Sequence, residues 1–510
     1  MNQYKVLAIQ QRDTRAIQEI SPTDTRKKYP VSLQEDTALR IYTQKTLVDT
    51  PIDPRDPHKQ TGMDIAVTYT WPPAIAASLF GGLDFDRFET AATKVIRQKP
   101  SLHSQFLIEG DQFCKVQGRF GDLRLERGTT PHGRSINFCL NGMRILRVET
   151  NQSPDGTQGL KFCMSHLYAD AQAGFALLGD IAKEYAKSTL LIPFSAAFMT
   201  VVFPPNKLSV SSFNNGLFFM LSKLSIASPR IISERDEYLS LGKTQQDILA
   251  NPKFLNQMSD LKENYLSRTS PLEFSINPEL TLPPVTKRMV SKADLEACAE
   301  AAGSNKVAVL NFLAAVTAWA SNHERPVIFR SPRSARDSHG DTTYRATALL
   351  GDGNVTAEST LNSYTKASKK FRTDQTNPEN LQNLIPAERQ LQLINRKLPD
   401  TDGRPFSCEA EVNIFPAAFT GKTPFTMGHY LTRFDSKISL GEWSDPELYD
   451  PKLAFVLQEN KTAYSLEIGA HATLPEGARE HSEALFMALF NQLKQNPAAT
   501  ARELIEGLKR

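Results

Sequence analysis

Strand-like and helical patterns alternate through the first half of the chain. The arrangement of apolar and polar positions predicts strands at residues 64–71, 104–109, 112–116 and 160–165. Apolar residues recur at helical spacing from Phe85 to Ile96, and Pro100 ends that pattern. The same spacing returns from Phe175 to Tyr185. Residues 166–170 therefore connect a strand to a helix, a position at which a rigid scaffold often holds catalytic groups.

Helices and strands also follow one another in the second half of the chain. Ser291 with Asp294 three residues later predicts a helix start, and that helix runs over residues 295–302. Residues 307–320 are apolar on nearly every side, which is typical of a buried helix. Further elements are predicted as strands at 327–329, 411–415 and 463–468, and as an amphipathic helix at 475–495.

These patterns predict an α/β or α+β protein with two lobes. At 510 residues the chain is too long for one ordinary hydrophobic core. The predicted organisation is an N-terminal extension (1–60), an N-terminal lobe (61–187), a partly helical crossover (188–285) and a C-terminal lobe (286–510).

Composition, charge and the length of the apolar stretches indicate an ordinary globular protein. Hydrophobic residues make up 40% of the chain and charged residues 23%, as in ordinary globular proteins. A net charge of +3 argues against nucleic acid as a partner. The most apolar stretch, residues 190–203, contains Pro193 and is shorter than the roughly 20 residues that span a bilayer. The N-terminus lacks an apolar run of signal-peptide length, so we expect a cytoplasmic protein without a transmembrane segment.

Cysteine and histidine spacing argues against a metal site. The five cysteines contain no CxxC pair and are expected to be reduced, mostly buried thiols. No two of the nine histidines are three or four positions apart. A phosphate-binding loop, a GxGxxG turn, HExxH and GxSxG are all missing. The sequence thus predicts no metal and no permanently bound cofactor, and any residues that bind a cofactor stay unknown at this point.

One segment does carry a chemical signature, Ser165-His166-Leu167-Tyr168-Ala169-Asp170. Its HxxxD pattern is weak alone, but similar segments flank it in the right order. Residues 82–88 and 98–106 resemble a G-x-L-D helix and its exit, and residues 29–34 resemble a P-L-S-x-x-Q opening. Residues 332–336 and 350–354 are similar to an R … G-x-x-x-N stretch. Together these features resemble the chloramphenicol-acetyltransferase-like superfamily, which includes condensation domains and polyketide-associated acyltransferases.

The resemblance implies two chloramphenicol-acetyltransferase-like subdomains with an active-site tunnel between them. It also implies transfer of an acyl group from a thioester, carried by coenzyme A or an acyl carrier protein, to a hydroxyl or amine. His166 would be the general base, since a neutral imidazole has its pKa near working pH. Asp170 would pair with an arginine of the second lobe, for which Arg336 is the first choice and Arg333 the second. Ser165 or Asn413 is a candidate for stabilising the oxyanion.

The chain departs from the family pattern near the motif. Condensation domains commonly have two adjacent histidines, and Ser165 replaces the first; Ala171 stands where glycine is usual, and His103 where arginine is usual. Natural-product acyl transfer is the main prediction, with a CoA or phosphopantetheinyl thioester as co-substrate and a small-molecule acceptor. Two alternatives stay open: O-acylation of a lipid or glycolipid, and a catalytically silent docking or scaffold protein.

Overall fold

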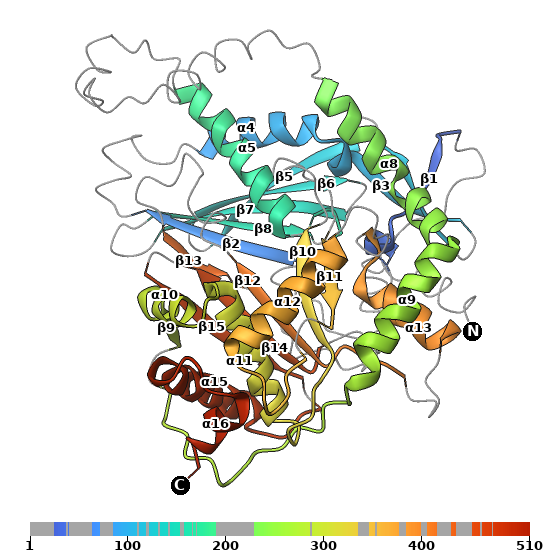
Figure 1. Cartoon of the computed structure of the whole chain (residues 1–510). Helices are drawn as coiled ribbons and strands as arrows, with labels where there is room; N and C mark the ends of the chain where they lie inside the picture. The colour runs from blue at the N-terminus through green and yellow to red at the C-terminus, as the bar shows by residue number, and fades with distance from the viewer. Residues whose placement is uncertain are drawn as a thin grey trace, which may run out of the picture.

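The computed structural model in Figure 1 covers the chain from end to end. It describes residues 25–36, 39, 64–71, 85–109, 112–118, 122–130, 133–140, 143–152, 158–165, 167–169, 171–189, 229–285, 288–334, 346–351, 354–376, 384–398, 405–415, 430–434, 451–459, 462–471 and 473–509. None of the helices in these ranges is both long and apolar enough to cross a lipid bilayer.

Six antiparallel strands form the main sheet of the N-terminal lobe, in the order β13-β2-β8-β7-β6-β5. The strands are β2 (Asp64–Trp71), β5 (Leu123–Thr130), β6 (Gly133–Leu140), β7 (Met143–Gln152), β8 (Gln158–Ser165) and β13 (Tyr430–Phe434). Two helices, α4 (Phe85–Gln98) and α5 (Ala171–Thr189), cover one face of this sheet (Figure 1).

The hydrophobic pattern explains which face is covered. Phe162 and Met164, two positions apart on β8, are buried in one cluster with Phe88 of α4 and Leu177 of α5. The rings of Phe88 and Phe162 meet edge to face with their centroids 5.6 Å apart. Each such side chain stabilises the fold by about 1.5–3 kcal/mol through burial. The predicted strand at 160–165 and the helical stripe that begins at Phe85 are therefore confirmed.

A second, three-stranded sheet completes the N-terminal lobe, with the order β1-β4-β3. Its strands are β1 (Lys28–Pro30), β3 (Ser104–Glu109) and β4 (Gln112–Gln117), and the short helix η1 (Pro100–His103) precedes β3. The β3–β4 hairpin agrees with the two strands predicted at 104–109 and 112–116. β1 lies within the residues assigned to the N-terminal extension and pairs with β4.

The C-terminal lobe contains a mixed six-stranded sheet in the order β11-β10-β12-β14-β15-β9. Its strands are β9 (Met289–Ser291), β10 (Phe329–Ser334), β11 (Ala346–Leu350), β12 (Ala410–Phe415), β14 (Leu453–Glu459) and β15 (Ala463–Ala470). β12 runs parallel to both β10 and β14, and the remaining pairs are antiparallel.

Helices pack on both faces of that sheet. The first face is covered by α10 (Lys292–Ala301), α11 (Lys306–Ala320), α15 (Ala478–Gln495) and α16 (Ala501–Glu506). The other carries α9 (Pro252–Asn264), η4 (Leu266–Arg268) and α13 (Ala387–Lys397). α12 (Leu361–Thr376) contributes Tyr364 to the first cluster and Phe371 to the second.

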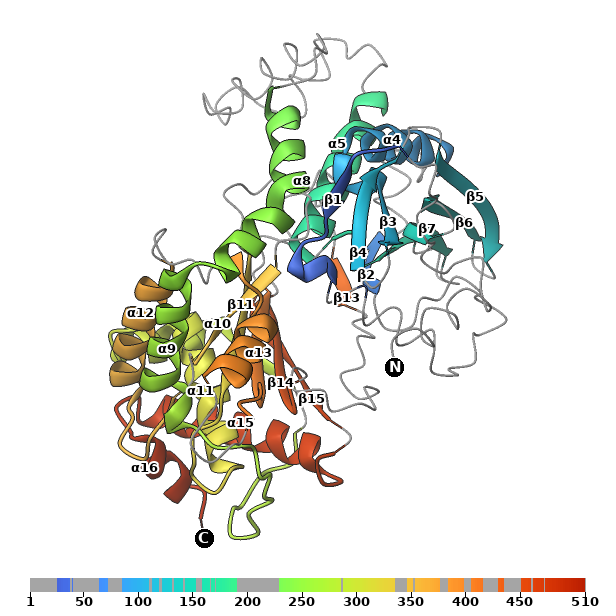
Figure 2. The same ribbon diagram turned by 90° about the vertical axis from the view of Figure 1, so that its right-hand side faces the viewer.

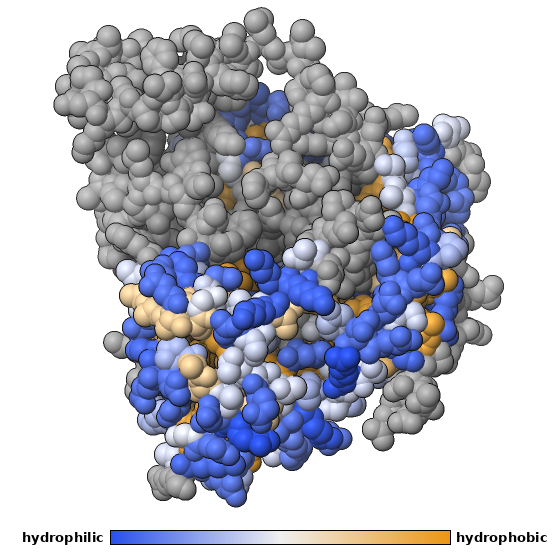
Figure 3. Space-filling model, in the orientation of Figure 1, coloured by the Kyte–Doolittle hydropathy of each residue, from blue (hydrophilic) through white to orange (hydrophobic). Residues whose placement is uncertain are grey.

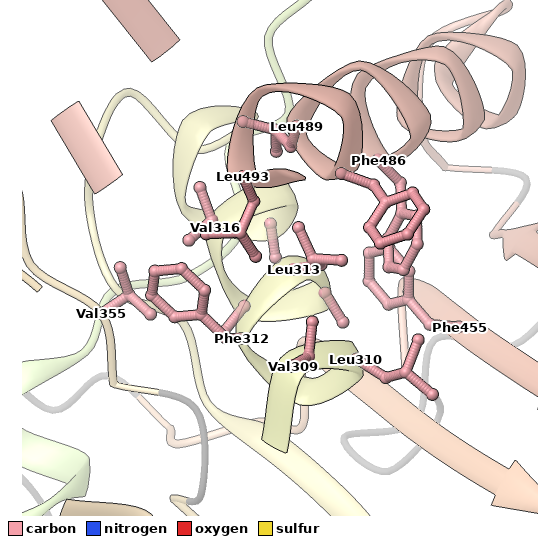
Figure 4. Packing of buried hydrophobic residues seen from close by; sticks show 14 of the residues in the cluster. Val309, Leu310, Phe312, Leu313, Val316, Val355, Phe455, Phe486, Leu489 and Leu493 are labelled. Atoms are coloured by element: carbon pink, nitrogen blue, oxygen red, sulfur yellow. The ribbon is translucent and has the colours of Figure 1, made fainter. Parts of the chain in front are cut away.

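α11 is the central helix of the C-terminal lobe. Residues Ala308 to Trp319 are all buried, as the uninterrupted apolar pattern predicts. Figure 4 shows Val316 and Leu313 next to Leu493 of α15, and Phe312 beside Val355. Phe455 of β14 packs in the same cluster against Phe486 of α15. The neighbouring helix α10 begins at the predicted cap, where the Ser291 side chain accepts a hydrogen bond from the Asp294 N–H.

Among the described residues, a helix and an exchanged strand connect the lobes. α8 (Pro229–Leu249) runs from the N-terminal lobe to α9, within the predicted crossover (Figure 2). β13 comes from the second half of the sequence but pairs with β2 in the N-terminal sheet. The assignment of residues 286–510 to a single lobe did not anticipate this exchange. The predicted fold class, mixed α/β with two lobes, is confirmed.

The described surface of the C-terminal lobe is mostly hydrophilic, with apolar residues scattered among charged ones (Figure 3). Large hydrophobic side chains exposed within the described ranges are Ile276, Met289 and Val307. Single exposed apolar residues are normal on a globular surface, so these three carry no argument for a binding site.

Candidate active site

The HxxxD segment occupies the connection between β8 and α5. His166 and Asp170 lie outside the described residues, but their neighbours in the chain are described. β8 ends at Ser165, and α5 begins at Ala171. The three residues of the intervening turn that are described, Leu167, Tyr168 and Ala169, are buried. The predicted strand-to-helix connection is therefore confirmed.

Hydrogen bonds and an aromatic contact hold this turn in place. The Tyr168 N–H donates to the Ser165 carbonyl oxygen over 3.1 Å. The Leu167 N–H donates to Ser165 Oγ over 3.4 Å, and Ser165 itself is almost completely buried. The rings of Tyr168 and Phe106 lie 5.5 Å apart, which ties the turn to β3. Ser165 thus has a structural role in the turn, and its role at an oxyanion stays a prediction.

The end of β8 lies in the interior of its sheet. β2 and β7 pair with it on either side, and Asp64 of β2 is the register partner of Ser165. β13, the strand from the second half of the chain, is the next neighbour beyond β2 (Figure 1). It pairs with residues 67–70 of β2, which lie opposite residues 159–162 of β8, before the end of that strand.

The sheet face opposite the helices carries polar side chains. Arg147 pairs in register with Cys163 and Asn137, and it forms an ion pair with Glu149. Asn137 is buried, as is Ser135 on the same strand.

The described cysteines do not have the properties of reactive thiols. Cys114, Cys139, Cys298 and Cys408 are all free and buried, which agrees with the prediction of reduced buried thiols. Burial raises the pKa of the Cys139 thiol to about 12, so this thiol is protonated at neutral pH. Within the described ranges, no three His, Cys, Asp or Glu side chains are arranged to hold a metal ion.

Of the candidate residues of the second lobe, the structure describes Asn413. Arg336, the predicted partner of Asp170, is outside the described residues. Asn413 is half-buried on β12, on the same side of the strand as Glu411. Glu411 accepts a hydrogen bond from Nε of Arg330 over 2.6 Å, within an ion pair between β12 and β10.

The Arg330–Glu411 pair was not predicted from the sequence, because the two residues are 81 positions apart. It fixes β10 to β12 only a few residues before the stretch that contains Arg336. Ser165 and Asn413 belong to different sheets. The two oxyanion candidates therefore lie on different elements. The role of His166 and the pairing of Asp170 with Arg336 stay predictions.

Comparisons with known proteins add independent information on the fold. No protein-family model matches the chain, and no curated protein matches its sequence. Solved structures do match over nearly its whole length. The first condensation domain of the calcium-dependent antibiotic synthetase superposes with a TM-score of 0.56 at 11% identity, covering 94% of this chain and 99% of that domain.

Two other solved structures show how widely this fold is shared. The condensation domain of the Monacolin K polyketide synthase gives a TM-score of 0.55 at 10% identity, over 93% of this chain and 99% of that one. The PapA2 acyl transferase gives 0.53 at 11% identity, over 93% and 95%. Because such low identities establish fold alone, the conclusion is a structural one. The chain has the two-lobed, chloramphenicol-acetyltransferase-like fold of condensation domains and related acyltransferases.

Proposed function

We propose that the protein transfers an acyl group from a thioester to a hydroxyl or amine, with His166 as general base. The observation that carries this proposal is the position of the HxxxD segment. It follows the last residue of β8, precedes α5, and encloses a buried turn held by Ser165 and Tyr168. Such support helps to hold a catalytic base in a reactive geometry.

The proposed reaction balances without a covalent enzyme intermediate. The neutral imidazole of His166 removes the proton of the acceptor O–H or N–H as the acceptor attacks the thioester carbonyl. The tetrahedral intermediate then collapses, its C–S bond breaks, and the departing thiolate takes the proton from the imidazolium. The products are an ester or amide and a free thiol. General-base catalysis of this kind contributes roughly 10²–10⁴-fold, and positioning of both substrates supplies much of the rest.

The other candidate residues have supporting roles in this proposal. Asp170 pairs with Arg336 and connects the motif to the second lobe. Because loss of one member would leave a buried charge uncompensated, this pair is structural. Ser165 or Asn413 supplies a hydrogen bond to the oxyanion. Ser165 is the more constrained of the two, since its Oγ already accepts a hydrogen bond from Leu167.

Coenzyme A or an acyl carrier protein would present the thioester, and the setting would be natural-product biosynthesis in the cytoplasm. The condensation-domain fold supports this choice of chemistry. The apolar stretches that would suit a lipid acceptor, residues 190–203 and 213–227, lie outside the described residues. The structure therefore adds no argument for a lipid or glycolipid substrate.

The test is a panel of acyl-CoA and acyl-carrier thioesters, incubated with wild type and with His166→Ala, with and without hydroxyl and amine acceptors. Thiol release and product mass would be measured together. Acceptor-dependent turnover that disappears in His166→Ala supports the proposal. Cys163→Ala is the matched control three positions away, and it should keep wild-type turnover. No turnover by wild type across the panel would instead favour the scaffold alternative.

A further inference from the structure

A short segment at the start of the described chain contacts both lobes. Its first part belongs to the N-terminal lobe, because β1 pairs with β4 and places Lys28 opposite Val116 and Pro30 opposite Cys114. Val31, the next residue, packs against the core cluster of the N-terminal lobe. Leu33, only two positions later, packs against the cluster beneath the C-terminal sheet. The chain crosses from one lobe to the other within these residues.

A buried ion pair fixes this segment to the N-terminal lobe. Lys115 Nζ of β4 lies 2.9 and 3.2 Å from the two carboxylate oxygens of Glu35. The Lys115 side chain has 0% exposure and that of Glu35 has 2%. Glu35 also accepts from the Ser32 N–H over 2.6 Å, and its own N–H donates to Ser32 Oγ over 3.2 Å. Both charges are therefore compensated inside the lobe.

Polar contacts of a different kind connect the segment to the C-terminal lobe. Asp36, the residue after Glu35, forms an ion pair with Arg389 of α13. Both side chains are partly exposed, unlike Glu35 and Lys115. Arg389 is oriented by its own helix, since its Nη1 donates to the Gln392 side chain over 2.6 Å. Adjacent carboxylates, Glu35 and Asp36, thus bind cations of opposite lobes.

Gln245 of α8 connects three parts of the chain at the same place. Its Oε1 accepts from the Leu33 N–H over 2.7 Å. Its Nε2 lies 2.9 Å from Gln34 Oε1 and 2.6 Å from the Leu384 carbonyl oxygen, just before α13. One turn earlier, a Cβ on Gly242 would lie 2.5 Å from the carbonyl oxygens of Pro30 and Val31. Only glycine allows α8 and the segment to approach so closely, and Figure 2 shows them side by side.

We propose that residues 31–36 form an interlobe clamp that holds the two lobes in a fixed relative position. The Glu35–Lys115 pair is its permanent anchor in the N-terminal lobe. The Asp36–Arg389 pair and Gln245 are its connections to the other side. Losing these connections would loosen the lobes relative to each other while each keeps its own core. The inference does not depend on the proposed acyl transfer, and its test needs no substrate.

The experiment compares wild type with Arg389→Ala and Gln245→Leu by hydrogen–deuterium exchange and small-angle X-ray scattering of the full chain. Arg396→Ala is the matched control, because Arg396 is an exposed cation on the same helix. In Arg389→Ala, amides of residues 31–36 should exchange about tenfold faster, the effect of losing one charge-assisted hydrogen bond. The radius of gyration should rise, while exchange in β6 and α11 stays at wild-type rates.

Three results would overturn the clamp. Unchanged exchange in residues 31–36 and an unchanged radius of gyration in both variants would show that these contacts hold nothing in place. A uniform rise in exchange through β6 and α11 would show that Arg389 and Gln245 support folding in general. Arg396→Ala should match wild type in both measurements, and a rise there equal to that of Arg389→Ala would also contradict the proposal.

Discussion

Lys115 is a charged residue enclosed entirely by the N-terminal lobe, with Glu35 as its counterion. Replacing Lys115 by Met keeps the length of the side chain but leaves the Glu35 carboxylate buried without its counterion. We expect the free energy of unfolding to fall by about 3–5 kcal/mol. Denaturant unfolding, followed by the fluorescence of the native tryptophans, would measure this loss.

The double variant Lys115→Met/Glu35→Leu separates the value of the pair from the cost of breaking it. Replacing both charges by apolar groups of similar volume is often close to neutral. The double variant should therefore be more stable than Lys115→Met alone. If it is less stable, the pair contributes directly to folding and the reasoning above is wrong.

His103 makes stability depend on pH. Burial lowers the pKa of its imidazole from the ordinary 6.5, and Nε2–H donates to the Ile96 carbonyl oxygen over 3.0 Å. The unfolded chain therefore binds a proton at a higher pH than the folded chain does. The contribution of His103 to the free energy of unfolding is therefore fully present above about pH 6.5. It is lost as the pH falls from there through the pKa of the folded state.

His103→Gln should accordingly lose less stability than wild type between about pH 6.5 and 5. Gln can replace the donor to Ile96 but takes up no proton in this range. Thermal unfolding at several pH values would compare the two proteins. Parallel curves would show that His103 is not responsible for acid sensitivity in this window.

At the level of secondary-structure elements, the same substitution should have opposite effects at two glycines. Gly351 follows β11 with φ of +88°, and a Cβ there would lie 3.0 Å from Cβ of Tyr265. Gly174 lies inside α5, where the contact that a Cβ would make with a described residue is Met164 Sδ at 3.6 Å, an ordinary distance. Gly351→Ala should destabilise by about 1–2 kcal/mol, and Gly174→Ala should stabilise by up to about 1 kcal/mol.

Denaturant unfolding of the two variants side by side gives the comparison. Each serves as the other's control, because both replace hydrogen by a methyl group. Equal changes in stability, in either direction, would contradict the conformations described for β11 and α5.

Elements with a strong local pattern could be predicted from the sequence, and elements chosen by tertiary pairing could not. β8, α5 and α11 have apolar spacing that fixes their type and buried face, and all three are confirmed. β6 alternates at Ile136, Phe138 and Leu140, so its sequence contains a strand signal. The pairing of β13 with β2 could not be predicted in this way, because no local pattern in residues 430–434 indicates which strand lies beside them.

The same contrast, between local patterns and contacts of distant residues, applies to the motif and to the ion pairs. The position of the motif after a strand follows from local periodicity, and the structure confirms it. The ion pairs Glu35–Lys115 and Asp36–Arg389 join residues 80 and 353 positions apart, so no local pattern could reveal them. The predicted partner of Asp170, Arg336, would belong to this second class, because it lies far along the sequence.

For the molecule as a whole, the important feature is that the two lobes are connected at several independent places. β13 joins the N-terminal sheet, α8 leads into the C-terminal lobe, and residues 31–36 contact both. A reaction between two separately bound substrates requires precise relative placement of the groups around them. Connections at several places would help to keep the two lobes in a constant relative position.

Acceptor-dependent thiol release by His166→Ala, measured against wild type under single-turnover conditions, tests the central claim most directly. Folded protein would be verified first by circular dichroism and by its unfolding transition. We predict a rate lower by roughly 10²–10⁴-fold, the usual contribution of a general base, with the unfolding transition unchanged. A rate within about twofold of wild type would contradict the account, because some other group would then be removing the acceptor's proton.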